Sequence, residues 1–127
     1  MKIELKFFKI LIMKKFLRAK IQYAVVKEKN LKYDGSITID RKIMDEAGIF
    51  PNEVVLVVNV NTGVRFETYV IEGKENSGII GLNGGAARLG EIGDELIIMS
   101  FEYGEKPDRA KVVILDENNR IKEIREK

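Results

Sequence analysis

The sequence predicts a mainly β protein with one or two short helices. Apolar and polar residues alternate with a period of two along several short segments, which is typical of strands with one buried face. Turn residues separate these segments at intervals of about 8–12 residues, as in all-β barrels and sandwiches. The 127 residues show no repeat and no boundary between domains, so we expect one domain.

The first expected strand spans residues 17–25. One of its faces carries Leu17, Ala19, Ile21, Tyr23 and Val25, and the other carries Arg18, Lys20 and Gln22. This alternation indicates a half-buried strand.

A short strand and a helix follow. The Tyr-Asp-Gly sequence at 33–35 is a turn signal before the strand 36–40, in which Ile37 and Ile39 point inward. Asp40 then suits the N-cap of a helix over 41–47, and Gly48 suits its C-terminal stop.

The second half of the chain predicts more strands. Residues 54–60 are almost continuously apolar, which indicates a strand buried on both faces. The remaining expectations are a turn at 61–63, strands at 64–71, 79–83 and 95–103, a glycine-rich loop at 84–90, and a charged hairpin at 112–124 with its tip at 116–119.

The composition excludes several kinds of chemistry. The chain has 22 Lys and Arg against 20 Asp and Glu, a net charge of +2, which is too small to favour nucleic acid as a partner. It contains neither Cys nor His, which excludes disulfides, thiolate metal sites and Ser-His-Asp triads. An enzyme of this composition would use carboxylates, Lys, Arg, Tyr, hydroxyls and backbone groups.

Residues 1–12 are expected to form an N-terminal extension. Residues 1–20 are strongly basic, and their apolar stretch is broken by Lys9. The stretch is far shorter than the ~20 residues that cross a bilayer. We therefore expect no membrane segment and no targeting signal, with Met13 as an alternative start.

The first candidate site is the segment Tyr33-Asp34-Gly35-Ser36. Asp-Gly tolerates positive φ, so an ordinary hairpin turn is one interpretation. The other is that the Ser36 hydroxyl attacks the carbonyl of Gly35, which needs a strained backbone and a hydroxyl free of the core. Alternation places Ser36 on a polar face with Thr38 and Asp40, which meets the second requirement.

The second candidate is Arg65-Phe66-Glu67-Thr68-Tyr69. Arg65 and Tyr69 can point to one side of a strand, with their backbones ~13 Å apart. Thr68 faces the other side, so a site that uses both Thr68 and Tyr69 needs a bulge, a strand end or a neighbouring subunit. A polar cross-strand face without a ligand is the alternative.

The third candidate is Asn83-Gly84-Gly85-Ala86-Ala87. Small residues after a strand let backbone N–H groups approach a carboxylate or phosphate, although a plain loop also explains them. No G-x-G-x-x-G fingerprint or long helical pattern is present, so dinucleotide binding is not supported. Lys20 is an ordinary exposed lysine unless an anion lies above it.

The order of these motifs is specific. Along the chain they are Lys20-Ile21, Tyr33-Asp34-Gly35-Ser36, Ile39-Asp40, Ala47-Gly48-Ile49, Asn59-Val60-Asn61-Thr62-Gly63-x-Arg65-Phe66-x-Thr68-Tyr69, and Asn83-Gly84-x-Ala86-Ala87. This set closely resembles the pyruvoyl-dependent aspartate 1-decarboxylases, from about Met13 to Tyr103.

The resemblance implies a six-stranded double-psi β-barrel and a homotetramer with sites between subunits. It implies a cytoplasmic enzyme that makes β-alanine from L-aspartate for pantothenate synthesis, with no nucleic-acid or membrane partner. The proenzyme would break its Gly35–Ser36 bond through an ester of the Ser36 hydroxyl, giving residues 1–35 and 36–127. Ser36 would become a pyruvoyl group that forms an imine with aspartate and takes up the electrons of decarboxylation. Neither a metal nor pyridoxal phosphate would be needed.

The resemblance also implies roles for individual residues. Arg65 would bind a substrate carboxylate, with Lys20 as a supporting cation, and Tyr69 would return a proton to the α-carbon. The other implied site residues are Thr68, Gly84, Gly85 and Ala86 for substrate binding, with Tyr33 and Asn83 in support.

Two departures and two alternatives remain. The N-terminal extension is unusual for the family, although Met13 as the start would restore the family's length. Gln22 stands where many family members have His, so any role of that His is absent or replaced. Segments 35–43 and 47–54 also resemble swapped-hairpin DNA-binding regulators, a reading that leaves the motifs at 65–69 and 83–87 unexplained. A non-catalytic adaptor barrel is the third possibility.

Overall fold

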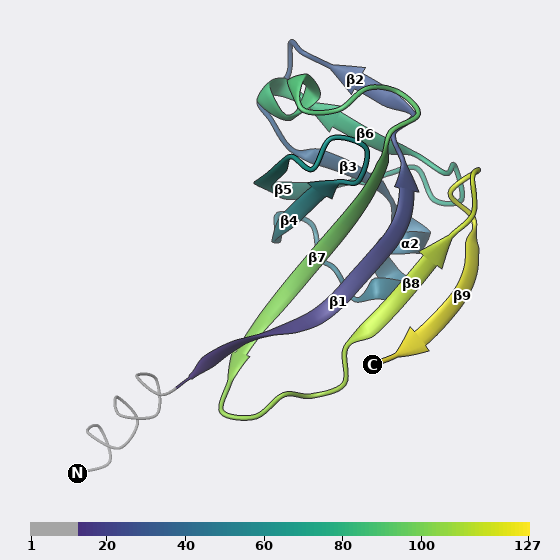
Figure 1. Ribbon diagram of the computed structural model, residues 1–127. Coiled ribbons are helices and arrows are strands. Elements are labelled where there is room, and N and C mark those ends of the chain that lie inside the picture. Colours follow the sequence, from purple (N-terminus) through teal and green to yellow (C-terminus); the bar gives the residue numbers. More distant parts are fainter. Residues whose placement is uncertain (1–12) are drawn as a thin grey trace.

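The structure is a computed structural model that describes residues 13–127. The extension expected at 1–12 lies outside the described residues. Within them, nine strands form one sheet in the order β2-β6-β3-β5-β4-β7-β1-β8-β9, with one α-helix and one 3₁₀ helix (Figure 1). The mainly β class expected from the sequence is confirmed.

Every strand expected from the sequence is present. The strands are β1 (Lys14–Val25), β2 (Glu28–Asn30), β3 (Ile37–Asp40), β4 (Val54–Asn59), β5 (Arg65–Gly73), β6 (Ile80–Asn83), β7 (Glu95–Gly104), β8 (Lys111–Leu115) and β9 (Ile121–Glu126). The helices are α2 (Arg41–Ala47) and η1 (Gly84–Arg88). Two elements are not predicted from the sequence: β2, whose three residues are too few to show a periodic pattern, and η1, which lies where a glycine-rich loop is expected.

The sheet curves around α2. This helix contacts β3 and β5 in one part of the strand order and β1 and β8 in the other. Figure 1 shows α2 behind β1 and beside β8. The hydrogen-bonded order runs from β2 to β9 without closing. A single buried cluster fills the interior, with Ile21, Ile37, Ile80, Leu82, Leu96 and Ile98 among its largest members.

The two ends of α2 are those that the sequence predicts. The Asp40 carboxylate accepts a hydrogen bond from the N–H of Lys42 at 2.8 Å, and Gly48 ends the helix with a φ of 71°. Ile43, Met44 and Ala47 are buried, which anchors the helix to the core. No helix among residues 13–127 is long and apolar enough to span a membrane.

The strand β4 differs from its expected burial. Val55 and Val57 are buried, but Val54 is 58% exposed and Val60, just after the strand, is 49% exposed. The expectation of burial on both faces is therefore wrong at the two ends, because these side chains point away from the core. The outward face of β4 is part of the molecular surface.

Candidate active site

Ser36 lies between Asn83 and Tyr69 across neighbouring strands. On one side, the backbone N–H of Asn83 donates to the Ser36 carbonyl at 3.1 Å. On the other side, Ile37 of β3 lies opposite Val70 of β5 in a parallel pair, which places Ser36 level with Tyr69. The fold thus brings one residue from each of the three candidate segments together: Ser36, Tyr69 and Asn83.

Asn83 also holds the Ser36 side chain. Its Nδ2 donates to Ser36 Oγ at 3.0 Å and to Thr38 Oγ1 at 2.9 Å. Both hydroxyls therefore face the same side of β3, as alternation predicts. Ser36 has no exposed surface, so its hydroxyl is enclosed by its neighbours and is held by Asn83. No role for Thr38 is predicted from the sequence, although its spacing of two from Ser36 is a usable signal.

The peptide bond between Gly35 and Ser36 lies in a strained turn. Gly35 has a φ of 105° and Ser36 a φ of 100°. Glycine adopts such values readily, whereas a residue with a β-carbon is strained there by about 1–3 kcal/mol. The strain is therefore located at Ser36, on one side of the bond that the sequence singles out.

Gly84 packs directly against this turn. A β-carbon on Gly84 would lie 2.5 Å from the backbone nitrogen of Gly35 and 2.5 Å from the carbonyl oxygen of Tyr33. Gly84 also has a φ of 61°, so both contact and conformation require glycine. A β-carbon on Gly85 would meet nothing within 4 Å. The backbone of η1 is thus held against the turn through Gly84, and Ala86 is buried behind it.

The residues of β5 divide between the two faces of the sheet. Thr68 lies opposite buried Val55, and Tyr69 lies opposite exposed Val54. Arg65, four residues before Tyr69, shares its face, with the two backbones ~13 Å apart. The structure agrees with the expectation that Thr68 and Tyr69 point to opposite sides.

Lys20 lies on the outward face of the sheet, on β1, which is four strand positions from β3 in the strand order. It is opposite Met99 of β7, Met99 is opposite Leu56 of β4, and Leu56 is opposite Glu67 of β5. Lys20 therefore shares a face with Arg65, at about 14 Å from the backbone of β5 across three strand spacings. Neither cation forms an ion pair within residues 13–127. Within one chain, neither cation therefore lies beside Ser36.

Asn59 connects the surroundings of η1 to the turn before β5. Its Nδ2 donates to the carbonyl of Leu89 at 3.0 Å and to Asp94 Oδ2 at 2.9 Å, while its Oδ1 accepts from the N–H of Asn61 at 3.0 Å. The hydrogen bond from Asn59, with that from the N–H of Glu91, lowers the pKa of Asp94 below its ordinary value. The sequence analysis missed this link, whose only signal is a polar residue at the end of an apolar strand.

Two further expectations concern ligands and Gln22. No group of three or more acidic residues within 13–127 is placed to hold a metal ion. Gln22 lies opposite Ile114 of β8, next to a bulge where Tyr23 has a φ of 66°. Nothing in the structure gives Gln22 a role.

The comparison with known proteins decides the family. The family model described as aspartate decarboxylase matches residues 12–122. The chain belongs to this family. It is 52% identical over 106 residues to the aspartate 1-decarboxylase of Thermotoga petrophila, covering 84% of this chain and 93% of that protein.

Other relatives agree with this assignment. The chain is 52% identical over 112 residues to the aspartate 1-decarboxylase of Neisseria meningitidis, covering 85% of this chain and 88% of that protein. For the aspartate 1-decarboxylase of Leptospira biflexa the identity is 53% over 110 residues, covering 83% and 93%. The crystal structure of the computationally designed msDPBB_sym2 protein aligns with a TM-score of 0.42 and 19% identity, covering 68% of this chain and 99% of that one.

The family membership confirms the resemblance found in the sequence. This member of the aspartate decarboxylase family is an enzyme of the decarboxylase class. The assignment favours the decarboxylase over the DNA-binding regulator and the adaptor barrel.

Proposed function

We propose that this chain is a proenzyme that cuts its own Gly35–Ser36 bond and then decarboxylates L-aspartate to β-alanine and CO₂. The observation that carries the proposal is the strained turn at Gly35 and Ser36, with the serine hydroxyl held by Asn83 at 3.0 Å. Strain at a peptide bond and a fixed adjacent nucleophile both favour attack on that bond.

The cut and the formation of the pyruvoyl group need no reagent from outside the chain other than water. Ser36 Oγ bonds to the carbonyl carbon of Gly35, the bond from that carbon to the Ser36 nitrogen breaks, and the hydroxyl proton passes to the nitrogen. Loss of the Ser36 α-proton then breaks the Cβ–Oγ bond, and Gly35 leaves as a carboxylate. Water replaces the amino group, which leaves as ammonia. Residues 1–35 and 36–127 result.

The surroundings of Ser36 fit the pyruvoyl group that would replace it. The position is fully buried, the amide of Asn83 points a donor at it, and Gly84 leaves no β-carbon against the turn. When present, the pyruvoyl group supplies a carbonyl that takes up the electron pair released by CO₂. No residue cluster for another cofactor is needed.

Substrate binding would use residues around this position together with Arg65 and Lys20 of the outward face. Arg65 offers a planar fork that binds a carboxylate through two hydrogen bonds, with Lys20 as a second cation. Tyr69, level with Ser36 in the sheet, is the proton donor to the α-carbon. The supporting groups are Thr68, Tyr33, Asn83 and the backbone of Gly84, Gly85 and Ala86.

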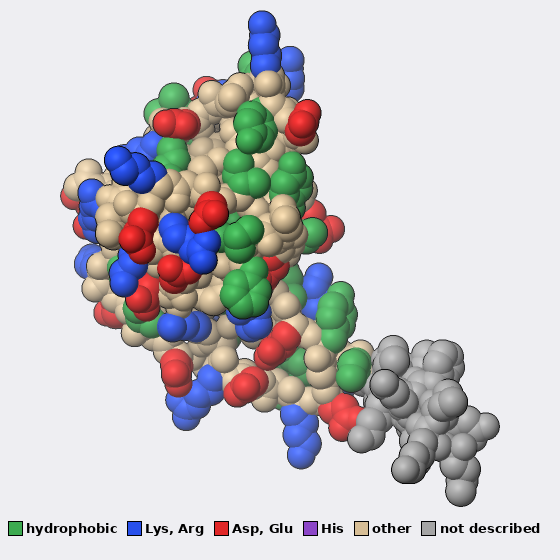
Figure 2. Space-filling view, turned by 180° about the vertical axis from the view of Figure 1, so that it is seen from behind, with side chains coloured by type: hydrophobic (Ala, Val, Ile, Leu, Met, Phe, Trp, Pro, Cys, Tyr) green, Lys and Arg blue, Asp and Glu red, His purple; other side chains and the backbone are tan. Residues whose placement is uncertain are grey.

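A homotetramer with sites between subunits would complete this set. Lys20 and Arg65 lie apart from Ser36 in one chain, on an outward face that also carries apolar side chains. These are Val54 and Leu56 of β4 and Ile97, Met99 and Phe101 of β7, of which Val54 is 58% exposed. Figure 2 shows hydrophobic side chains in a band down one side of the molecule. Apolar surface of this kind favours contact with another subunit.

The deciding experiment is an intact mass under denaturing conditions. The proposal expects two pieces, residues 1–35 and 36–127, the larger lighter than a serine-headed chain by the mass of ammonia. The Ser36→Ala chain is the matched control and should remain one species. A wild-type chain that stays a single species of 14.5 kDa after prolonged warming would contradict self-cleavage.

The substrate is tested separately on the cut protein. We expect β-alanine and CO₂ from L-aspartate, which would serve cytoplasmic pantothenate synthesis. A cut protein that forms no β-alanine would keep the maturation step but contradict the substrate. D-aspartate and L-glutamate are suitable comparison substrates.

A further inference from the structure

We propose that Thr38 is a positioning residue for the cut between Gly35 and Ser36. The Thr38 hydroxyl fixes the amide of Asn83 so that one of its N–H groups points at Ser36 Oγ. This inference rests on the proposed self-cleavage and names a residue that controls it.

The geometry places one amide between two hydroxyls. Asn83 Nδ2 lies 3.0 Å from Ser36 Oγ and 2.9 Å from Thr38 Oγ1. An amide nitrogen carries two hydrogens, and here each has its own acceptor. If the acceptor at Thr38 is lost, one buried N–H has no partner, which costs about 1–3 kcal/mol. Rotation of the amide away from its present position then becomes favourable, because the unpaired N–H can reach another acceptor.

The N–H that points at Ser36 matters for the chemistry of the cut. Negative charge develops on Ser36 Oγ as it loses its proton, and again when the Cβ–Oγ bond breaks and this oxygen leaves with Gly35 as a carboxylate. A donor already aimed at the oxygen stabilises this charge without reorganisation. Thr38 never touches the reacting atoms, and it acts only through Asn83.

The methyl group of Thr38 sets the direction of the hydroxyl. A β-carbon on Gly73 would lie 3.0 Å from Thr38 Cγ2, so the methyl group is seated against Gly73. Because a β-branched side chain has few χ1 positions, seating the methyl group fixes the hydroxyl toward Asn83.

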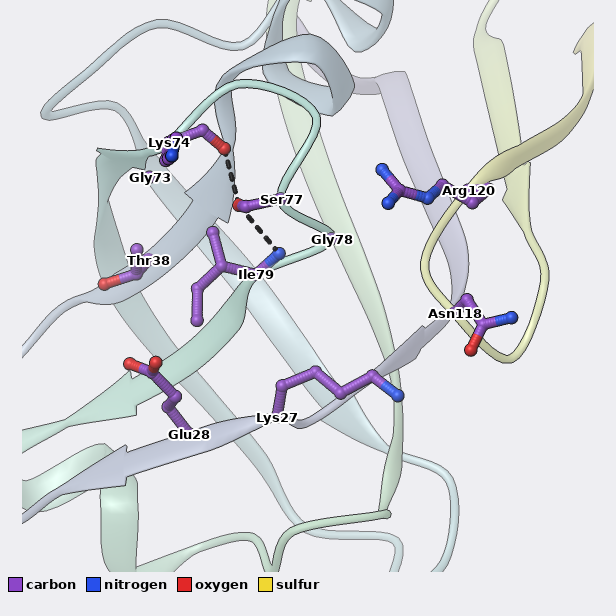
Figure 3. A pocket seen from close by; sticks show the side chains of 10 residues that line it. All are labelled: Lys27, Glu28, Thr38, Gly73, Lys74, Ser77, Gly78, Ile79, Asn118 and Arg120. Carbon is purple, nitrogen blue, oxygen red and sulfur yellow. Dashed lines mark hydrogen bonds between the residues drawn. The ribbon is translucent and has the colours of Figure 1, made fainter.

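Thr38 also forms part of the wall of a cavity of about 760 Å³. Figure 3 shows Thr38 beside Ile79 and Gly73, with Glu28 of β2 and Lys27, just before this strand, also lining the cavity. Thr38 thus lies between this cavity and the buried pair of Asn83 and Ser36. Valine at position 38 would keep the shape of the wall while removing the acceptor.

The test follows the fraction of cut chain over time by denaturing mass spectrometry, starting from freshly refolded precursor. We expect T38V to slow the cut at least about tenfold, since one charge-stabilising donor is worth about 10²–10³-fold when removed outright. T38S keeps the acceptor but loses the methyl group that orients it, so its rate should fall between those of T38V and wild type. Ser77→Ala removes another hydroxyl from the same cavity and should cut at the wild-type rate.

A double-mutant cycle separates positioning from a general loss of stability. In an Asn83→Ala background, T38V should cause no further slowing, because its effect passes through the amide. An equal slowing in both backgrounds would overturn the inference. The inference would also be overturned if the T38V chain were cut at the same rate as the wild-type chain. If wild-type protein is not cut at all, the proposed function fails together with this inference.

Should T38V not fold, T38A provides a second chain without the acceptor and with a smaller side chain. Thermal unfolding of each variant in the uncut Ser36→Ala background shows whether it is folded. T38A should slow the cut as T38V does, and a wild-type rate in a folded T38A chain would contradict the role of Thr38.

Discussion

Gly84 and Gly35 are in backbone contact, so close that a β-carbon on Gly84 would come within 2.5 Å of the Gly35 nitrogen. The contact joins the start of η1 to the turn that holds the Gly35–Ser36 bond. It involves two rigid backbone segments rather than the end of a flexible side chain. Either segment must therefore shift if Gly84 gains a side chain.

We expect Gly84→Ala to lower the free energy of unfolding by about 2 kcal/mol or more, from the clash and from the positive φ. The measurement is urea unfolding in the uncut Ser36→Ala background. Gly85→Ala is the matched control, because its β-carbon would enter open space, and it should change stability by less than about 0.5 kcal/mol. Equal effects at the two glycines would show that the contact is not important.

Arg65→Ala should leave the cut intact and lower kcat/KM for L-aspartate about 100-fold. The physical reason is the loss of a bidentate, charge-assisted contact with a substrate carboxylate. Arg65→Lys should recover only part of the loss, since an ammonium cannot form the same fork. Arg125→Ala on the exposed strand β9 is the control. Full activity of the Arg65→Ala enzyme would remove Arg65 from the site.

Tyr69→Phe should lower kcat about 100-fold, because general acid catalysis commonly contributes that much. The phenyl ring keeps the packing and removes only the hydroxyl, so the cut should proceed. Tyr23→Phe, at an exposed tyrosine, serves as the control. The measurement is the rate at which the product takes up solvent deuterium at the α-carbon. An unchanged rate in the Tyr69→Phe enzyme would contradict the role of Tyr69 as proton donor.

The sequence predicts most of the fold because period-two alternation and turn residues are local signals. The helix 41–47 is predicted with both caps, since Asp40 and Gly48 act on their own neighbours. The exposure of Val54 is not predicted, because an apolar run alone does not tell how many of its faces are covered. Local signals therefore predict which residues form a helix or strand better than they predict how far each side chain is buried.

The arrangement of the candidate site could not be predicted from the sequence. The link from Thr38 through Asn83 to Ser36 joins residues 45 and 47 positions apart, and only the strand register reveals it. The fully buried state of Ser36 likewise depends on Asn83 and η1, which come much later in the chain. The separation of Lys20 from Ser36 depends on the order of the strands in the sheet. The alternation of apolar and polar residues carries no information about this order.

Asn119 connects the β8–β9 turn to two other parts of the fold. It is 1% exposed, its Oδ1 accepts from the N–H of Val25, and its Nδ2 donates to the carbonyls of Val25 and Gly78, each at 2.8 Å. Asn119→Ala should lower the unfolding free energy by about 2–4 kcal/mol, from unpaired buried groups and a positive φ. Urea unfolding of the uncut chain measures this.

The neighbouring residue gives a control for Asn119. Asn118→Ala, in the same turn but exposed, should have an effect of less than about 0.5 kcal/mol. Asn119→Gly tolerates the φ of 57° and should fall between the two. An Asn119→Ala chain as stable as Asn118→Ala would show that the three hydrogen bonds add nothing to stability.

The last prediction concerns Glu53, which lies between Arg18 and Ser100. Burial alone would raise its pKa, but hydrogen bonds from Ser100, from the N–H of Phe50 and from Arg18 lower it below the ordinary 4.5. Arg18 NH2 lies 2.7 Å from Glu53 Oε2. Because the folded pKa is the lower one, the charged carboxylate stabilises the fold above the unfolded pKa, and this stability is lost as pH falls through the folded pKa.

We therefore expect Glu53→Gln to be less stable than its parent at pH 7 and to lose less stability between about pH 5 and pH 3. The measurement is urea unfolding of the uncut chain across this range. Glu123→Gln, on the exposed strand β9, should follow the parent curve. If Glu53→Gln and its parent lost stability in parallel, the carboxylate would titrate alike in the folded and unfolded chains. The network with Arg18 and Ser100 would then contribute nothing to acid sensitivity.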